Sequence, residues 1–172
     1  MPDRAAKALA QWRKERPYLD SEPMAILGRL AEAALLVARD RLEPLFAGFG
    51  LQAGEFDVLA TLRRSGAPYA LTPTALYEAT MISSGGMTNR IDRLEKAGFV
   101  ERRPHPSDRR GALVALTEKG GALIDQAVGA HVENERAILD LLTPADQAAL
   151  DGLLAKLIAG LTSMPPPTAP RN

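Results

Sequence analysis

The stretch from residue 72 to residue 117 constrains the fold most, because its apolar pattern changes from helical to alternating spacing within a few residues. Thr72 and Pro73 are typical of the N-cap and first turn of a helix, and Gly98 is typical of a helix end. Directly afterwards, FVERR and ALVAL alternate as paired strands do, and a loop with two prolines and a glycine joins them. The pattern predicts a helix-turn-helix followed by a β-hairpin wing.

Further helices are predicted on both sides of this stretch. They are expected at residues 3–16, at 23–46, at 52–66, from Thr117 to about Leu142, and from Thr143 onward. The helix at 52–66 is apolar on two sides, which is typical of a buried helix. The fold class is therefore mainly α with a small β-hairpin wing, a winged helix-turn-helix.

Composition excludes several classes of protein. The 172-residue chain has no cysteine, which removes disulfides, thiol redox switches and cysteine-ligated zinc. His105 and His131 lie far apart in sequence, so we expect no histidine metal site and no cofactor. No nucleophile–base pair or phosphate-binding glycine loop is evident, so we do not expect an enzyme.

The sequence also gives an expectation about location. No apolar run approaches the roughly 18 residues of a membrane helix, and the charged N-terminal segment has no apolar core typical of a signal peptide. We therefore expect a cytoplasmic protein without a membrane partner.

The helix expected from Ser83 or Ser84 to Gly98 has two different faces. Met87, Ile91 and Leu94 form an apolar stripe, and the opposite face carries hydroxyl, amide and basic groups that suit base edges and phosphates. A solvated helix face with a flexible first turn is the alternative. The predicted DNA contacts of this helix are Ser84, Gly85, Thr88, Asn89, Arg93 and Lys96.

The expected wing adds positive charge. Residues 83–111 hold seven Arg or Lys against four Asp or Glu, although the whole chain has a net charge of zero. Arg109 and Arg110 lie at the loop tip, where an arginine can enter a minor groove. Asp108 can stabilise the wing by holding one guanidinium through a charge-assisted hydrogen bond. An ordinary charged turn is the alternative.

Several runs resemble the MarR family of winged-helix regulators. They are GEFDVLATL, LTPTALYEAT, SSGGMTNRIDRLEKAGFVERR and PHPSDRRGALVALTEKG, and Asp108 to Arg110 followed by Leu116-Thr117 matches the wing signature of that family. The resemblance implies a homodimer with interleaved terminal helices, and two recognition helices and two wings on duplex DNA. Leucines at 139, 141, 142 and from 150 to 161 exceed what one small body can cover, which favours a dimer over packing within a monomer.

Four further residues are unusual for their positions. Arg90 lies beside the apolar stripe of its helix, Asp57 lies between two apolar faces, and Arg102 alternates with Arg103 on the first wing strand. Trp12 lies in an N-terminal extension that has little else to bury. These positions resemble the urate-responsive subgroup of the family, which carries the extension and binds a purine-type ligand with a tryptophan, an aspartate and two arginines.

The resemblance implies a role for each residue. Trp12 would stack on a planar ring, Arg102 would pair with an anionic oxygen, and Arg90 and Asp57 would satisfy the remaining polar groups. Plainer interpretations stay open, because Trp12 can simply pack the extension, Asp57 can form a structural salt bridge, and Arg102 can contact phosphate.

The sequence thus predicts a ligand-responsive transcription regulator, with repression the favoured mode. As a homodimer it would bind a pseudo-palindromic operator, and a purine-type anion such as urate would weaken that binding by linkage. The alternatives are a regulator that responds to a phenolic or other aromatic anion, and a dimeric module without DNA binding. The expected parts are an N-terminal extension and dimerisation helix (1–50), a DNA-binding domain (51–117), C-terminal dimerisation helices (118–162) and a disordered tail (163–172).

Overall fold

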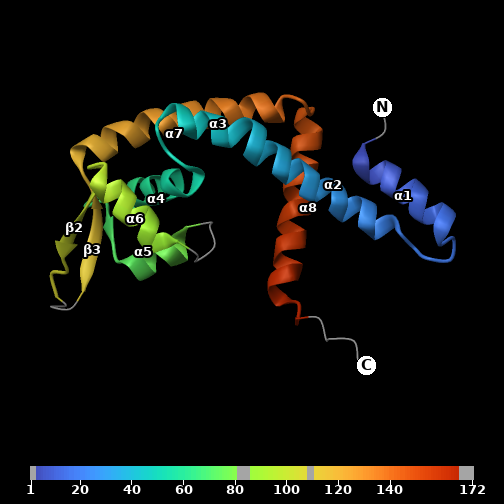
Figure 1. The fold of residues 1–172 in the computed structure, drawn as a ribbon, viewed down its shortest axis with the longest axis horizontal. Helices are drawn as coiled ribbons and strands as arrows, with labels where there is room; N and C mark the ends of the chain where they lie inside the picture. The colour runs from blue at the N-terminus through green and yellow to red at the C-terminus, as the bar shows by residue number, and fades with distance from the viewer. Residues whose placement is uncertain (1–2, 81–85, 108–110, 167–172) are drawn as a thin grey trace. The chain divides into compact units, whose positions relative to one another are not determined.

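The computed structural model describes residues 3–80, 86–107 and 111–166 (Figure 1). The chain divides into two compact units, 1–134 and 135–172. The elements, in chain order, are α1 (Arg4–Glu15), α2 (Glu22–Val37), a π-helical turn η1 (Ala38–Leu42), α3 (Glu43–Gly48), α4 (Ala53–Arg64), β1 (Ala70–Leu71), α5 (Pro73–Ala79), α6 (Met87–Lys96), β2 (Val100–Pro104), β3 (Ala112–Leu116), α7 (Glu118–Leu139) and α8 (Pro144–Ser163).

The first unit contains a winged helix-turn-helix, which confirms the predicted fold class. Helices α4, α5 and α6 pack beside an antiparallel sheet with the order β1-β3-β2, in which Val100 pairs with Leu116 and Pro104 with Ala112. The core holds the predicted apolar stripe of α6 and the apolar side chains of α4, whereas none of the leucines predicted at 150–161 on α8 is buried. The fully buried large side chains of the core include Leu59 and Leu62 of α4, Leu76 of α5, Leu94 of α6 and Ile124 of α7.

The long N-terminal helix runs on from α2 into α3 through a widened turn. The N–H of Glu43 donates to the carbonyl of Ala38, five residues back. Pro44 follows and has no N–H, and in a regular helix its ring would clash with the carbonyl four residues earlier. A π turn next to the proline relieves that conflict. The helix predicted at 23–46 has nearly the same bounds as the observed run from α2 to α3, but the sequence analysis did not predict the π turn.

Helix α6 begins later than predicted. We expected Ser83 or Ser84 as its cap, whereas the helix starts at Met87 and its N-cap is Gly86 with φ 90°. Glycine adopts this left-handed backbone without the Cβ penalty of other residues, and a right-handed helix does not continue through it. Ser83 and Ser84 themselves lie outside the described residues.

Other helix caps follow the sequence closely. The Thr72 hydroxyl accepts from the N–H of Ala75, and the Thr143 hydroxyl accepts from the N–H of Asp146. The Thr117 hydroxyl accepts from the N–H of Gly120 at 3.0 Å and donates to the carbonyl of Gly98 at 2.8 Å. Thr117 therefore joins the start of α7 to Gly98, just beyond the end of α6.

The second unit contains the end of α7 and the whole of α8. Helix α7 ends at Leu139, three residues before the expected Leu142, and the Gln147 side chain donates to the carbonyls of both residues. Helix α8 has no buried residue among its 20. The predicted disordered tail lies outside the described residues from 167 onward. Within the described ranges, no helix combines the length and apolar character needed to span a bilayer.

Candidate nucleic-acid interface

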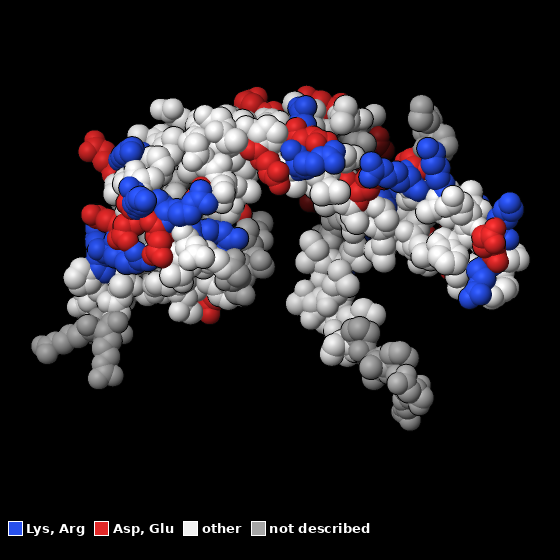
Figure 2. Space-filling model, viewed as in Figure 1, with Lys and Arg blue, Asp and Glu red and all other residues white. Residues whose placement is uncertain are grey.

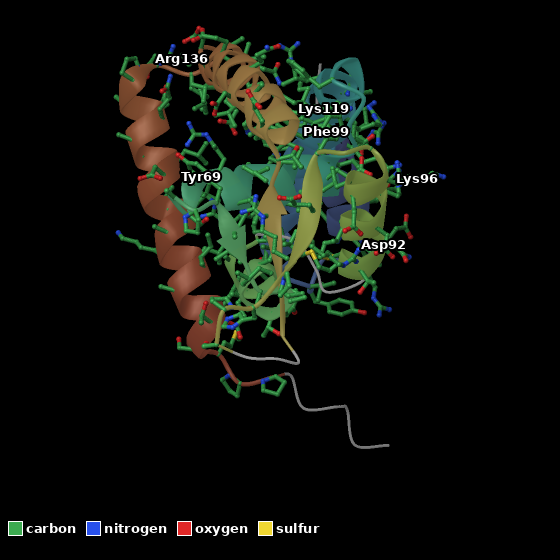
Figure 3. The ribbon with its side chains drawn as sticks, turned by 90° about the vertical axis from the view of Figure 1, so that its left-hand side faces the viewer. Tyr69, Asp92, Lys96, Phe99, Lys119 and Arg136 are labelled. Atoms are coloured by element: carbon green, nitrogen blue, oxygen red, sulfur yellow. The ribbon has the colours of Figure 1, made fainter. Side chains whose placement is uncertain are left out.

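Helix α6 presents the two faces expected from its sequence. Met87, Ile91 and Leu94 are buried against the core. Thr88, Asn89, Asp92, Arg93 and Lys96 are exposed, and Figure 3 labels Asp92 and Lys96 on this helix. The other predicted DNA-contact and wing residues, Ser84, Gly85, Asp108, Arg109 and Arg110, lie outside the described residues and stay predictions.

Arg102 ties the base of the wing to α6. Its guanidinium forms ion pairs with Asp92 and Glu95, and its backbone N–H donates to Glu95 Oε1 at 3.1 Å. The hydrogen bond with Asp92 is the main cause that raises the pKa of Arg102 above its ordinary value. On the next position, Arg103 pairs with Glu101. Figure 2 accordingly shows acidic and basic side chains intermixed over this part of the surface.

Arg93 also has an acidic neighbour, which sequence reasoning missed. Its Nε lies 3.0 Å from Glu55 Oε1, and the Glu55 side chain is only 5% exposed. Glu55 Oε2 accepts the backbone N–H of Gln52 at 2.7 Å, as one half of a capping box. In the sequence, a glutamate three residues after a glutamine cap indicates only a helix start.

Asp57 and Arg90 lie near one another, on α4 and α6. Burial raises the pKa of the half-buried Asp57 carboxyl, and coulombic interactions with His131 and Arg90 oppose that rise. Arg90 packs over Gly54, where an added Cβ would overlap the Arg90 Nε. Arg90 Nη1 is buried and has no hydrogen-bond partner among the described residues. We call Gly54, Asp57, Arg90 and His131 the Asp57–Arg90 site.

Aromatic rings border this site. Phe46 of α3 stacks on Phe56 of α4, with ring centroids 4.2 Å apart. The His131 ring lies 4.8 Å from the Phe56 centroid and 5.4 Å from that of Phe46. Asp57 therefore lies next to an aromatic cluster, where electrostatic interactions are stronger than in water.

The other two predicted effector residues have different neighbours. Trp12 is 39% exposed and lines a groove of about 370 Å³ between α1 and α2, together with Ala25 and Gly28. Arg102 is paired with Asp92 and Glu95, as described above. Of the four predicted residues, the described contacts therefore bring together Asp57 and Arg90, but not Trp12 or Arg102.

Asp57 should lower stability at neutral pH. Because its folded-state pKa is raised, its contribution to stability is greatest below the ordinary carboxyl pKa and is lost as the pH rises through the folded pKa. We expect Asp57→Asn to raise the melting temperature at pH 7 by about 1–3 °C, with a gain that shrinks toward pH 4. Thermal melts across this range test it, and Asp125→Asn, at an exposed pair with Arg63, is the control. A lower melting temperature at pH 7 would show that electrostatic attraction to neighbouring groups such as Arg90 outweighs desolvation.

Comparison with known proteins agrees with this architecture. The MarR family profile matches residues 49–111. The HTH-type transcriptional regulator PecS of Dickeya dadantii is 47% identical over 147 residues, which cover 86% of this chain and 88% of that protein.

Two solved structures extend the comparison. The MarR family regulator Sco3205 of Streptomyces coelicolor, in complex with DNA, matches with a TM-score of 0.73 and 28% identity over 85% of this chain and 91% of that one. BpsR of Bordetella bronchiseptica, whose DNA binding is regulated by 6-hydroxynicotinic acid, matches with a TM-score of 0.69 and 29% identity over 82% and 96%. These similar proteins are regulators, not enzymes.

Proposed function

The chain belongs to the MarR family as a DNA-binding transcription regulator of PecS-like type, and from this membership we propose how it binds and releases DNA. As a homodimer it binds a pseudo-palindromic operator and represses the adjacent gene. A purine-type anion such as urate binds each protomer and lowers its affinity for DNA.

Helix α6 is the reading helix in this proposal. Thr88, Asn89 and Lys96 are exposed on it and offer a hydroxyl, an amide and a cation to the major groove. Ser84 and Gly85 precede it, while Arg109 and Arg110, steadied by Asp108, reach the minor groove from the wing. The exposed polar face of α6 favours this function over a dimeric module that does not bind DNA.

Homodimer formation would cover apolar surface that one protomer leaves in water. Leu153, Ile158 and Leu161 of α8 are each more than half exposed, as are Leu27 and Leu35 of α2. Figure 2 shows the α8 region as a largely uncharged surface. A twofold pair would place two α6 helices about one turn of DNA apart, roughly 34 Å.

One observation carries the effector proposal: the buried Arg90 Nη1 has no hydrogen-bond partner among the described residues, next to a half-buried Asp57. A buried cationic donor without an acceptor is costly, so an anion that supplies one is stabilised there. A purine-type anion offers oxygens to Arg90 and a ring N–H to Asp57. BpsR, whose DNA binding is regulated by 6-hydroxynicotinic acid, supports a planar heteroaromatic anion as the effector.

Trp12 and Arg102, which the described contacts do not bring to Asp57 and Arg90, would join the site when the ligand binds, by stacking on the ring and by pairing with an anionic oxygen. Arg102 would then exchange Asp92 and Glu95 for the ligand, which loosens the tie between wing and α6. DNA and ligand would weaken each other by the same factor.

A phenolic or other aromatic anion is the second candidate ligand. A phenolic anion such as salicylate supplies oxygens to Arg90 but brings no ring N–H to Asp57. Because Asp57 is half-buried, we favour a ligand that donates to it.

Mobility shifts on the gene's own upstream DNA test the proposal. Urate should weaken binding about 5- to 150-fold, more than xanthine or salicylate at equal concentration. Asp57→Asn should bind the DNA normally yet lose most of this response, and Arg63→Gln, on the same helix but paired with Asp125, should keep it. Unchanged DNA binding with all three compounds, and no heat in calorimetric titrations, would falsify the effector proposal.

A further inference from the structure

We infer that Glu55 is a positioning residue for DNA recognition: it fixes the direction of the Arg93 side chain and thereby raises specific over non-specific binding. The inference rests on the proposed role of α6 as the reading helix. Glu55 lies on α4 and was not among the predicted site residues.

The carboxylate of Glu55 is a rigid anchor. Its side chain is 5% exposed, and a buried carboxylate is stable only when both oxygens are satisfied. The Gln52 N–H holds Oε2 at 2.7 Å, which prevents rotation of the group. The remaining oxygen, Oε1, lies 3.0 Å from Arg93 Nε.

Arg93 contacts Glu55 through its guanidinium Nε, and the rest of the side chain is accessible to solvent. Its side chain is 57% exposed, in contrast to the buried Glu55. Arginine has five N–H donors in one plane, and the ion pair at Nε restrains where that plane lies. Among the described residues the Nη groups have no hydrogen-bond partner, so four donors remain for a phosphate or a base edge. An arginine held in this way loses less rotamer freedom on binding than an unrestrained one.

The ion pair goes beyond what the helix cap requires. A capping box needs only an acceptor at position 55, and a glutamine supplies one as well. The negative charge of Glu55 interacts with the N-terminus of α4 and forms the ion pair with Arg93. The preceding residue, Gly54, contacts Arg90. The first turn of α4 therefore contacts two arginines that lie one turn apart on α6.

The test is Glu55→Gln in the full-length protein, because glutamine keeps the cap and removes the charge. The probes are a duplex that the wild-type protein enriches from random-sequence DNA and a scrambled duplex of equal length. We expect affinity for the enriched duplex to fall about 5- to 10-fold, since a base or phosphate contact loses its fixed geometry. Affinity for the scrambled duplex should stay constant or rise, because a negative charge is lost.

Asp125→Asn is the matched control, because it makes the same change of charge on α7 at the pair with Arg63. It should leave the ratio of the two affinities unchanged. Arg93→Lys should lower the ratio, and adding Glu55→Gln to it should have no further effect. Since Arg93 is exposed, this variant tests the contact even if Glu55→Gln does not fold.

Two outcomes overturn the inference in different ways. If Arg93→Lys lowers the ratio but a folded Glu55→Gln does not, then Arg93 reads DNA without help from Glu55. If Arg93→Lys leaves the affinity for the enriched duplex unchanged, then the assignment of Arg93 to the DNA interface fails as well. Loss of the urate response alone affects neither result, because every measurement is made without effector.

Discussion

Replacing Gly120 by alanine is expected to unfold the winged helix-turn-helix, or to lower its free energy of unfolding by more than about 4 kcal/mol. A Cβ at Gly120 would lie 2.8 Å from the carbonyl carbon of Phe99 and closer still to its oxygen. The obstacle is backbone, which cannot move aside as a side chain can. Urea and thermal unfolding followed by circular dichroism measure the effect.

Gly121→Ala is the matched control, because the two glycines are neighbours on the same helix. A Cβ at Gly121 meets nothing within 4 Å. Alanine in a helix is more favourable than glycine by roughly 0.5–1 kcal/mol, so this variant should be slightly more stable than the wild type. Similar stability of the two variants would show that α7 can shift away from Phe99.

The close approach at Gly120 has a consequence for recognition. The Phe99 carbonyl also accepts the Thr117 N–H at 3.1 Å, so the start of α7 is fixed to the start of the wing. Lys119 Nζ donates to the Ala97 carbonyl at 2.8 Å and lies 4.6 Å from the Phe99 ring centroid (Figure 3). The first turn of α7 therefore contacts the end of α6, and a weaker contact here should also disturb the position of α6.

Features with a local cause could be predicted from the sequence. Thr72 was predicted as a cap, and helices were predicted to start at Thr117 and Thr143, because the hydroxyl of a cap bonds the backbone within three residues. The buried stripe of α6 followed from its spacing. These features depend only on neighbours along the chain.

Features with a distant cause could not be predicted. Strand β1 has two residues and no pattern of its own, and it exists because Ala70 and Leu71 pair with β3. The late start of α6 depends on the backbone of Gly86, where the sequence offered two serines as more usual caps.

The residues of the candidate site also differ in whether their contacts could be predicted from the sequence. Asp57 and Arg90 were conspicuous as charges beside apolar stripes, and the structure places them near one another. Arg102 was noted, but its pairing with Asp92 and Glu95 needs the distance between a strand and a helix. Glu55 was missed because its cap role, which is ordinary, hides its second contact with Arg93.

Charge on the apolar stripe of α8 should separate the proposed dimer. Leu153 and Leu161 are 64% and 59% exposed in one protomer, so glutamate at both positions should leave the fold of the chain intact. In an interface the same carboxylates would be buried without partners, which costs several kcal/mol each. We expect the double variant Leu153→Glu, Leu161→Glu to sediment as a monomer.

Affinity for the operator should fall when the dimer dissociates. Two linked half-site contacts bind about 100- to 10,000-fold more tightly than one, so the double variant should lose at least about 100-fold in affinity for its operator. Ala159→Glu is the control, because at 100° per residue it places the same carboxylate on the opposite side of α8. It should remain dimeric and bind normally. A double variant that stays dimeric with full operator affinity would place the interface elsewhere than on this stripe, whereas a monomer that still binds tightly would contradict the twofold mode of recognition itself.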